Sequence, residues 1–144
     1  MDMLNGDTLL EAMKRCDEYA DIEVCIALKS LWSTQELTDA FYNEIKGNRL
    51  GAWMIDRGIT RGKAALQSVR GSHIHILNIQ SSELFRGKRF HWVLFEDGIS
   101  ADALEALSYM ECLTAPWEQT PESVELDSFL DSFKIVPNMN LVSE

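Results

Sequence analysis

Long apolar runs and a basic leader are both missing from this sequence. Its purely apolar runs, such as Trp92 to Phe95, fall far short of the ~20 residues that a bilayer-spanning helix needs. The first residues, MDMLNGD, contain no basic region ahead of an apolar stretch, so they predict no secretory leader. The sequence therefore favours a soluble, cytoplasmic protein without a membrane partner.

Cysteine is scarce as well. Cys16, Cys25 and Cys112 are odd in number, widely spaced and without a CxxC pair. This pattern predicts neither a disulfide framework nor a cysteine-based zinc site. We expect three buried thiols in a reducing compartment, because free cysteine is usually buried.

Length and composition suit one globular core. The chain has 144 residues, of which 46% are hydrophobic and 25% are charged, as is typical of a folded domain. We predict an α/β domain over residues 1–116 and an acidic segment over 117–144. Four apolar residues of that segment recur at helical spacing, which predicts an amphipathic helix that packs on the sheet or binds a partner: Leu126, Phe129, Leu130 and Phe133.

Basic residues are few outside one stretch. The net charge is −10. Residues 1–56 carry eleven acids and five bases, and residues 90–144 carry eleven acids and one base. Residues 57–89 instead carry seven bases and one acid. This basic stripe either contacts phosphates weakly, or its residues pair with the chain's own acids or lie in solvent. The second interpretation is favoured, because the net negative charge of the whole chain would repel DNA at long range. The candidate nucleic-acid or phosphate contacts are Arg61, Lys63, Arg70, Arg86, Lys88 and Arg89.

Hydrophobic periodicity and capping patterns predict alternating helices and strands. Thr8 with Glu11, and Ser33 with Glu36, have the spacing of capping boxes that begin helices, and Gly47 has the place of a C-cap. The predicted helices are 8–19, 33–46 and 100–113, residues 60–69 are compatible with another, and the predicted strands are 22–28, 73–79 and 90–95. This order is typical of a three-layer α/β fold with a mostly parallel sheet, in which ligands bind at the carboxyl ends of the strands.

Residues 71–97 contain three segments in a characteristic order. They are GSHIHILN at 71–78, RGKRF at 86–90 and VLFED at 93–97. This order resembles the Walker B region of the large-terminase ATPases of tailed phages. The strand at 24–28 followed by STQEL at 33–37 is similar to a strand and a glutamine-bearing helix of the same family. The resemblance covers roughly residues 8–112.

The resemblance implies a P-loop NTPase-like fold and a role in DNA packaging. In that family, two adjacent acidic residues follow the strand that VLFED resembles, and they act together. One acid holds the magnesium ion that bridges nucleotide phosphates, and its neighbour orients the attacking water. The corresponding residues here are Glu96 and Asp97.

The phosphate-binding loop of that family is degenerate or missing here. At the matching position, Asp7 stands between Gly6 and Thr8 where the family has lysine, and it would repel a triphosphate. Only five residues precede Gly6, too few for the strand that normally sets up the loop. Glu96 and Asp97 also stand in the reverse of the family's usual order. We therefore predict degenerate nucleotide contacts at Gly6 and Thr8, Walker B-like acids in an inactive site, and no cofactor unless another chain completes the site for magnesium and ATP.

Three further patterns are less specific. Gly58 to Ala64 superficially resembles a phosphate loop, but its glycines are one residue too close and Ala64 lacks the hydroxyl that binds magnesium. Trp53 to Ala65 faintly resembles the turn of a DNA-binding helix-turn-helix. His73 and His75 lie on one face of a strand, as surface residues or as ligands that bind a metal with a nearby carboxylate. Two histidines on a strand are usually surface residues, so we predict no metal site.

Three functions follow as hypotheses. The first is a phage-related, non-catalytic terminase-like protein of the host cytoplasm that binds a protein or nucleic-acid partner. The second is an ATPase component of DNA packaging that completes its site with another chain in an oligomer. Asp7 argues against this second hypothesis. The third is an acidic inhibitor or decoy of a nucleic-acid-handling complex, and the basic stripe argues against a uniform DNA mimic.

Overall fold

The computed structural model describes residues 1–47, 50–56, 63–80 and 87–118. The chain divides into two compact units, Met1–Leu113 and Thr114–Glu144. In the second unit, the described residues include a short 3-10 helix, η2, at Pro116–Glu118. The amphipathic helix predicted for the carboxyl-terminal segment lies outside the described residues.

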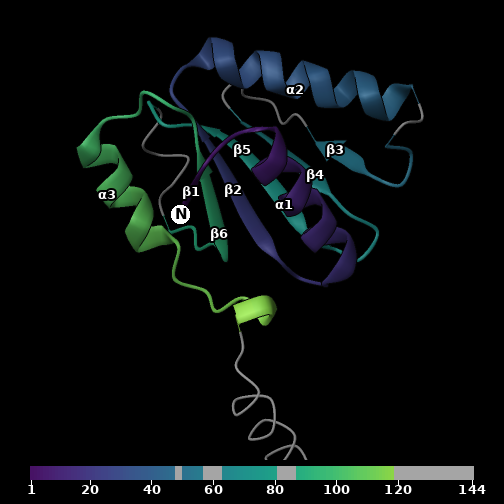
Figure 1. The fold of residues 1–144 in the computed structure, drawn as a ribbon. Coiled ribbons are helices and arrows are strands. Elements are labelled where there is room, and N and C mark those ends of the chain that lie inside the picture. Colours follow the sequence, from purple (N-terminus) through teal and green to yellow (C-terminus); the bar gives the residue numbers. More distant parts are fainter. Residues whose placement is uncertain (48–49, 57–62, 81–86, 119–144) are drawn as a thin grey trace, which may run out of the picture. The chain divides into compact units, whose positions relative to one another are not determined.

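A six-stranded sheet forms the centre of the first unit (Figure 1). Its strands are Asp2–Met3 (β1), Glu23–Leu28 (β2), Met54–Asp56 (β3), Lys63–Gln67 (β4), His73–Asn78 (β5) and Trp92–Phe95 (β6). Across the sheet they follow the order β1-β6-β2-β5-β4-β3. Strands β1, β6, β2 and β5 are parallel to one another. Strand β4 pairs antiparallel with β5, and β3 pairs antiparallel with β4. The predicted α/β class is confirmed, and the sheet is mixed.

Helix α1, Gly6–Glu18, begins two residues before the predicted start. Its N-cap is Asn5, whose side-chain Oδ1 accepts a hydrogen bond of 2.9 Å from the backbone N–H of Thr8. In return, the hydroxyl of Thr8 accepts a hydrogen bond of 2.9 Å from the backbone N–H of Asn5. Thr8 is therefore the last residue of a capping box and not its first. The helix buries Ala12 and Cys16.

Helix α2, Leu31–Lys46, also begins before the predicted capping box. Ser30 is the N-cap, because its hydroxyl accepts a hydrogen bond of 3.1 Å from the backbone N–H of Ser33. The cap thus lies three residues earlier than predicted. Gly47 follows the last turn as the C-cap, which confirms the predicted end of this helix.

Different helices cover the two faces of the sheet. Side chains alternate along β2, so that Cys25 points to one face and Val24 to the other. Helix α3, Ala101–Met110, packs on the first face, where Leu107 joins the core cluster of Cys25, and α1 and α2 pack on the second. Ser100 caps α3 as predicted. None of the described helices is long and apolar enough to cross a membrane.

Strand β4 contradicts the helix considered for residues 60–69. Ala64 and Leu66 are buried and Ala65 between them is half-buried, which is the alternation of a strand. This strand pairs with β3 on one side and with β5 on the other. Pairing with residues distant in the chain therefore outweighs the local pattern. Residues 60–62 lie outside the described residues.

Two of the three cysteines are buried. Cys16 and Cys25 are fully buried, whereas Cys112 is exposed, which corrects the expectation of three buried thiols. Burial, together with the nearby Asp17 and Glu23 carboxylates, raises the pKa of Cys16 to about 12. Burial likewise raises the pKa of Cys25. Both thiols are therefore protonated and unreactive at neutral pH.

Strand β6 is buried on both faces, since Val93 and Leu94 point opposite ways and both are 0% exposed. An aspartate at either position places an unpaired charge in the core, which costs several kcal/mol against a total stability of roughly 5–15 kcal/mol. We expect neither Val93→Asp nor Leu94→Asp to fold. The matched control is Val69→Asp, at a turn residue that is 75% exposed, and it should unfold at the wild-type temperature. Circular dichroism during heating checks this, and a folded Val93→Asp or Leu94→Asp chain would disprove the position of β6.

Candidate functional sites

Glu96 links the end of β6 to the start of α2. Its Oε1 accepts a hydrogen bond of 2.9 Å from the backbone N–H of Lys29, and its Oε2 accepts one of 3.2 Å from the hydroxyl of Ser33. Lys29 precedes the N-cap Ser30 and Ser33 lies in the first turn of α2, so the carboxylate lies at the amino end of this helix, where the helix dipole favours a negative charge. The first of the two predicted Walker B-like acids is therefore engaged in holding a helix terminus.

Asp97, the second predicted acid, has a different environment. It is exposed in the turn after β6, next to Gly98, whose φ of +92° favours glycine. A side chain at Gly98 would also approach Nζ of Lys29, which lies 3.4 Å from the position of an added Cβ. The two acids thus share one end of the sheet, but they do not share one set of contacts.

The predicted nucleotide contacts, Gly6 and Thr8, lie in the first turn of α1. The hydroxyl of Thr8 donates a hydrogen bond of 2.9 Å to the carbonyl of Met3, and its backbone N–H is bound by Asn5. A Cβ at Gly6 would meet no described atom within 4 Å, so crowding does not require glycine there. Strand β1 precedes this turn, which corrects the expectation that the chain has no room for a strand before Gly6.

The residues of the predicted basic stripe are divided between the two opposite ends of the strands. Lys63 begins β4, beside the carboxyl end of β5, whereas Arg70 lies in the turn before the amino end of β5. With ~3.3 Å per residue, these backbone positions are roughly 15–20 Å apart. Lys88 and Arg89 lie in the segment before β6. Two further members lie outside the described residues: Arg61 and Arg86.

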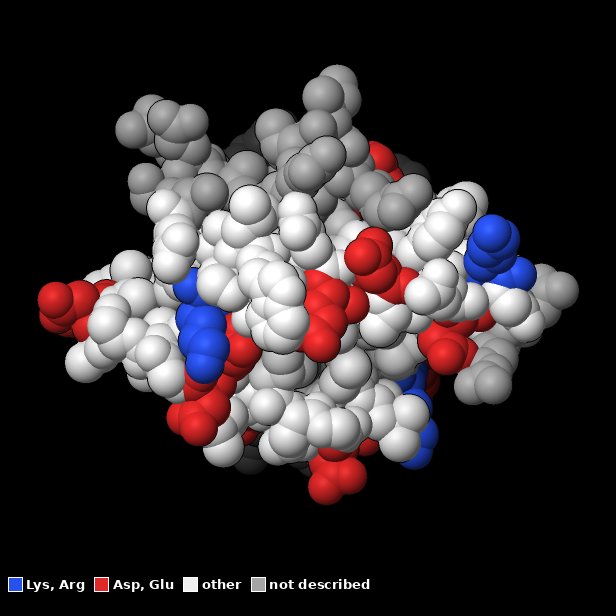
Figure 2. Space-filling model, turned by 90° about the horizontal axis from the view of Figure 1, so that it is seen from above, with Lys and Arg blue, Asp and Glu red and all other residues white. Residues whose placement is uncertain are grey.

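Figure 2 shows the charge on one face of the molecule. Acidic side chains are spread over this face, and the Lys and Arg side chains stand apart from one another. A basic groove that follows a nucleic-acid backbone needs cations close together. The described Lys and Arg side chains of this face are not gathered in that way.

A cluster of two histidines and one glutamate lies at the amino ends of β2 and β5. His73 and His75 point to the same face of β5, and Glu23 is the register partner of His73. Oε2 of Glu23 lies 2.8 Å from Nε2 of His75, and Oε1 lies 3.3 Å from Nδ1 of His73. One ligand atom from each residue lies within 4.8 Å of the other two. Sequence reasoning singled out the histidines but missed Glu23, which only the strand pairing brings to them.

The carboxylate of Glu23 is stabilised in its charged form. Burial raises its pKa, but the hydrogen bond with His75 and the charges of His75 and His73 outweigh burial, so the pKa of Glu23 lies below its usual 4.5. A carboxyl group with a lowered pKa stabilises the fold at pH values above its ordinary pKa. That contribution is lost as the pH falls through the lowered value.

One nitrogen of the cluster is buried without a hydrogen bond. Nδ1 of His73 is shielded from solvent and makes no hydrogen bond to the described residues, although the carboxylate of Glu23 is at ion-pair distance. Both histidines open on a pocket of about 500 Å³. Its lining residues are Met54, Ile55, Asp56, Ala65, Gln67, His73 and His75. The arrangement combines lone-pair donors with room for a further ligand.

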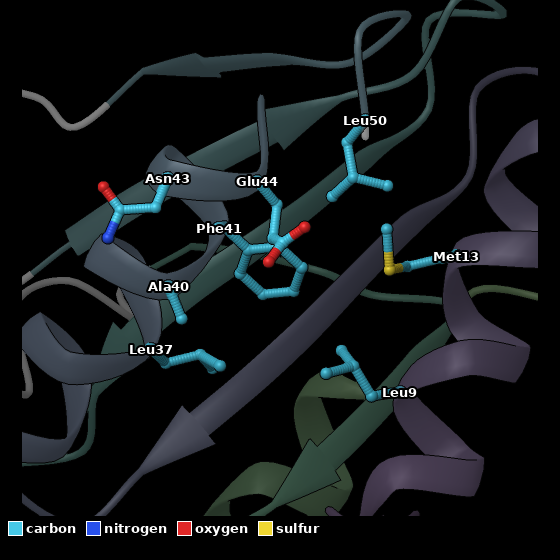
Figure 3. A pocket seen from close by; sticks show the side chains of 8 residues that line it. All are labelled: Leu9, Met13, Leu37, Ala40, Phe41, Asn43, Glu44 and Leu50. Carbon is cyan, nitrogen blue, oxygen red and sulfur yellow. The ribbon is translucent and has the colours of Figure 1, made fainter. Parts of the chain in front are cut away.

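A second pocket, of about 410 Å³, lies between α1 and α2 (Figure 3). Most of its lining is apolar, with Leu9 and Met13 from α1 facing Leu37 and Phe41 from α2. Such a lining suits an apolar side chain more than it suits acid–base chemistry. The remaining lining residues are Ala40, Asn43, Glu44 and Leu50.

Comparisons of this chain with protein-family models, with curated proteins and with solved structures give no match.

The contacts of Glu96 lead to a prediction about stability. Glu96→Ala removes the acceptor for Lys29 N–H and for the Ser33 hydroxyl, so we expect a loss of about 1–2 kcal/mol in the free energy of unfolding. Asp97→Ala removes a carboxylate from the exposed turn and should change stability by less than about 0.5 kcal/mol. Urea denaturation of the two variants measures the difference. Equal stability of both variants would contradict the anchoring role of Glu96.

Proposed function

We propose that this chain is a phage-related, non-catalytic protein of the terminase-ATPase type that acts by binding a protein partner. The supporting observation lies at the carboxyl ends of the parallel strands, where a nucleotide hydrolase of this class binds its ligand. There Asn5 bonds the amino end of α1, and Glu96 bonds the amino end of α2. These are helix ends of the kind that bind phosphates, and here one carries the cap of Asn5 on the N–H of Thr8 and the other has the negative charge of Glu96 beside it.

The order of the described elements is compatible with the resemblance. Strand β2 leads into α2, and β5 is followed along the chain by β6, whose end carries Glu96 and Asp97. A short strand, β1, runs parallel to β6 and leads directly into α1. The non-catalytic part of the proposal depends on the site contacts, and the terminase-like part depends on this order together with the sequence segments.

Glu96 accepts one hydrogen bond on each of its carboxylate oxygens, which fixes the orientation of the carboxylate. Hydrogen bonds to charged groups contribute about 1.5–3 kcal/mol, so any turn of this carboxylate toward a magnesium ion that breaks them is opposed. Asp7 in the first turn of α1 adds a negative charge where a triphosphate would approach. Both effects favour a binding role over an ATPase that completes its site with another chain.

The first test is ATP turnover. We expect the purified chain to release no phosphate from ATP and magnesium above the background of the Glu96→Gln variant, because its carboxylate and its helix termini are engaged internally. A phosphate-release assay over several hours measures this. Steady turnover that either Glu96→Gln or Asp97→Asn abolishes would refute the proposal.

The pocket between α1 and α2 is the surface that we assign to the partner. Its apolar lining suits an apolar side chain, and the partner segment around that side chain should be basic, because this chain carries a net charge of −10. Leu9 lines this pocket and is half-buried, whereas its neighbour Leu10 is 54% exposed and does not line it. The two leucines therefore form a matched pair for mutation.

The second test uses that pair. Leu9→Arg places a cation in the pocket and should reduce capture of the partner from the native host at least about tenfold, whereas Leu10→Arg, with the same change in charge, should retain it. Capture on immobilised chain followed by quantitative mass spectrometry measures the difference, after circular dichroism has verified that both variants fold. Equal capture by both variants, or capture that nuclease treatment abolishes, would contradict a protein partner at this pocket.

A further inference from the structure

We propose that Glu23, His73 and His75 bind one divalent transition-metal ion, with Zn²⁺ as the probe. One carboxylate and two imidazoles are a donor set that zinc uses in proteins. Glu23 and His73 begin β2 and β5, whereas Glu96 follows the end of β6. The cluster therefore lies at the other end of the parallel strands, and this inference is independent of the function proposed above.

The spacing of the donor atoms suits a metal ion. With metal–ligand distances of about 2.0–2.1 Å, neighbouring ligand atoms of a tetrahedral site are about 3.3 Å apart. Nδ1 of His73 lies 3.3 Å from Oε1 of Glu23. Nε2 of His75 lies 2.8 Å from the other carboxylate oxygen, Oε2 of Glu23, and one ligand atom from each of the three residues lies within 4.8 Å of the other two. For metal binding, Nε2 of His75 would release the proton of this hydrogen bond, to solvent or to Nδ1 of the same ring, and the side chains would shift to bring all three atoms to the tetrahedral separation.

The buried nitrogen of His73 has an ion-pair contact but makes no hydrogen bond to the described residues. Nδ1 is shielded from solvent and lies 3.3 Å from Oε1 of Glu23. A buried nitrogen whose hydrogen bonding is incomplete is costly, and in native structures a ligand, ion or water often compensates. A metal ion at the centre of the cluster would take the lone pair of this nitrogen.

Hydrogen bonds and ring packing fix two of the three proposed ligand residues. Glu23 is bonded twice to His91: its N–H donates to Nδ1 of His91 at 2.9 Å, and its carbonyl accepts from the N–H of His91 at 2.8 Å. The ring of His75 packs against Phe90 with 5.6 Å between the ring centroids. Ligands fixed on neighbouring strands are preorganised, so little ordering is needed when the ion binds.

The metal would keep one open position. Three protein ligands leave a tetrahedral ion with room for water or an anion, as in open zinc sites. The pocket of about 500 Å³ beside His73 and His75 provides the space for that fourth ligand.

The test is zinc binding by the full chain in a Cys112→Ser background, which removes the exposed thiol as a competing ligand. Isothermal titration should give one Zn²⁺ per chain with micromolar or tighter affinity. Glu23→Gln and His73→Asn should each weaken binding at least about tenfold, since even changes outside the ligand set cost that much. The control is Glu36→Gln, which removes an exposed carboxylate from α2 and should bind zinc as the parent does.

A second readout distinguishes the cluster from adventitious binding. Co²⁺ bound by one carboxylate and two imidazoles gives the visible absorption of a tetrahedral site, and His75→Asn should abolish it. Both substituted histidines are partly exposed, so these variants should fold, and circular dichroism before titration verifies it. Absence of zinc binding by the parent, or unchanged binding by Glu23→Gln and His73→Asn, would show that the cluster is only a glutamate–histidine ion pair.

Discussion

The parallel pairing of β2 with β5 on one side and with β6 on the other is the constraint on which the rest of the structure depends. Every residue from Val24 to Leu28 is buried, so both faces of this strand need cover. Helix α3 covers one face, and α1 with α2 cover the other. The same register also decides which polar side chains meet, because it places Glu23 beside His73 at one end of the strands and Ala27 beside Phe95 at the other.

The connection between β6 and α2 follows from this register. The backbone N–H of Glu96 donates to the carbonyl of Ala27, which brings the carboxylate to the first turn of α2. There it accepts hydrogen bonds from the N–H of Lys29, just before the N-cap, and from the hydroxyl of Ser33. Glu96, whose type and position resemble those of a catalytic acid, thus has a structural role. The sequence segment alone does not distinguish the two roles, because both require a carboxylate directly after a buried strand.

Elements with strong local signals could be predicted from the sequence, and those decided by distant contacts could not. The alternating run of β2 and the C-cap Gly47 were predicted correctly. Thr8 belongs to a capping box but ends it, and Ser33 follows the N-cap Ser30 by three residues and is not the cap itself. The sequence does not separate these cases, because a hydroxyl at either position has the same three-residue spacing to a polar partner. Strand β4 was missed because its alternation has meaning only beside β3 and β5. Glu23 was missed as a member of the cluster for the same reason.

The two ends of the parallel strands differ in the kind of ligand that they can bind. At the carboxyl ends of such sheets, free N–H groups at helix termini ordinarily attract anions. In this chain Asn5 and Ser30 each cap one N–H of those termini, and the carboxylate of Glu96 places a negative charge beside the second one. At the amino ends, the groups that converge are two imidazoles and a carboxylate, which offer lone pairs and negative charge. An end that offers lone pairs and a negative charge favours cations over anions, which is the electrostatic basis of the metal site proposed above.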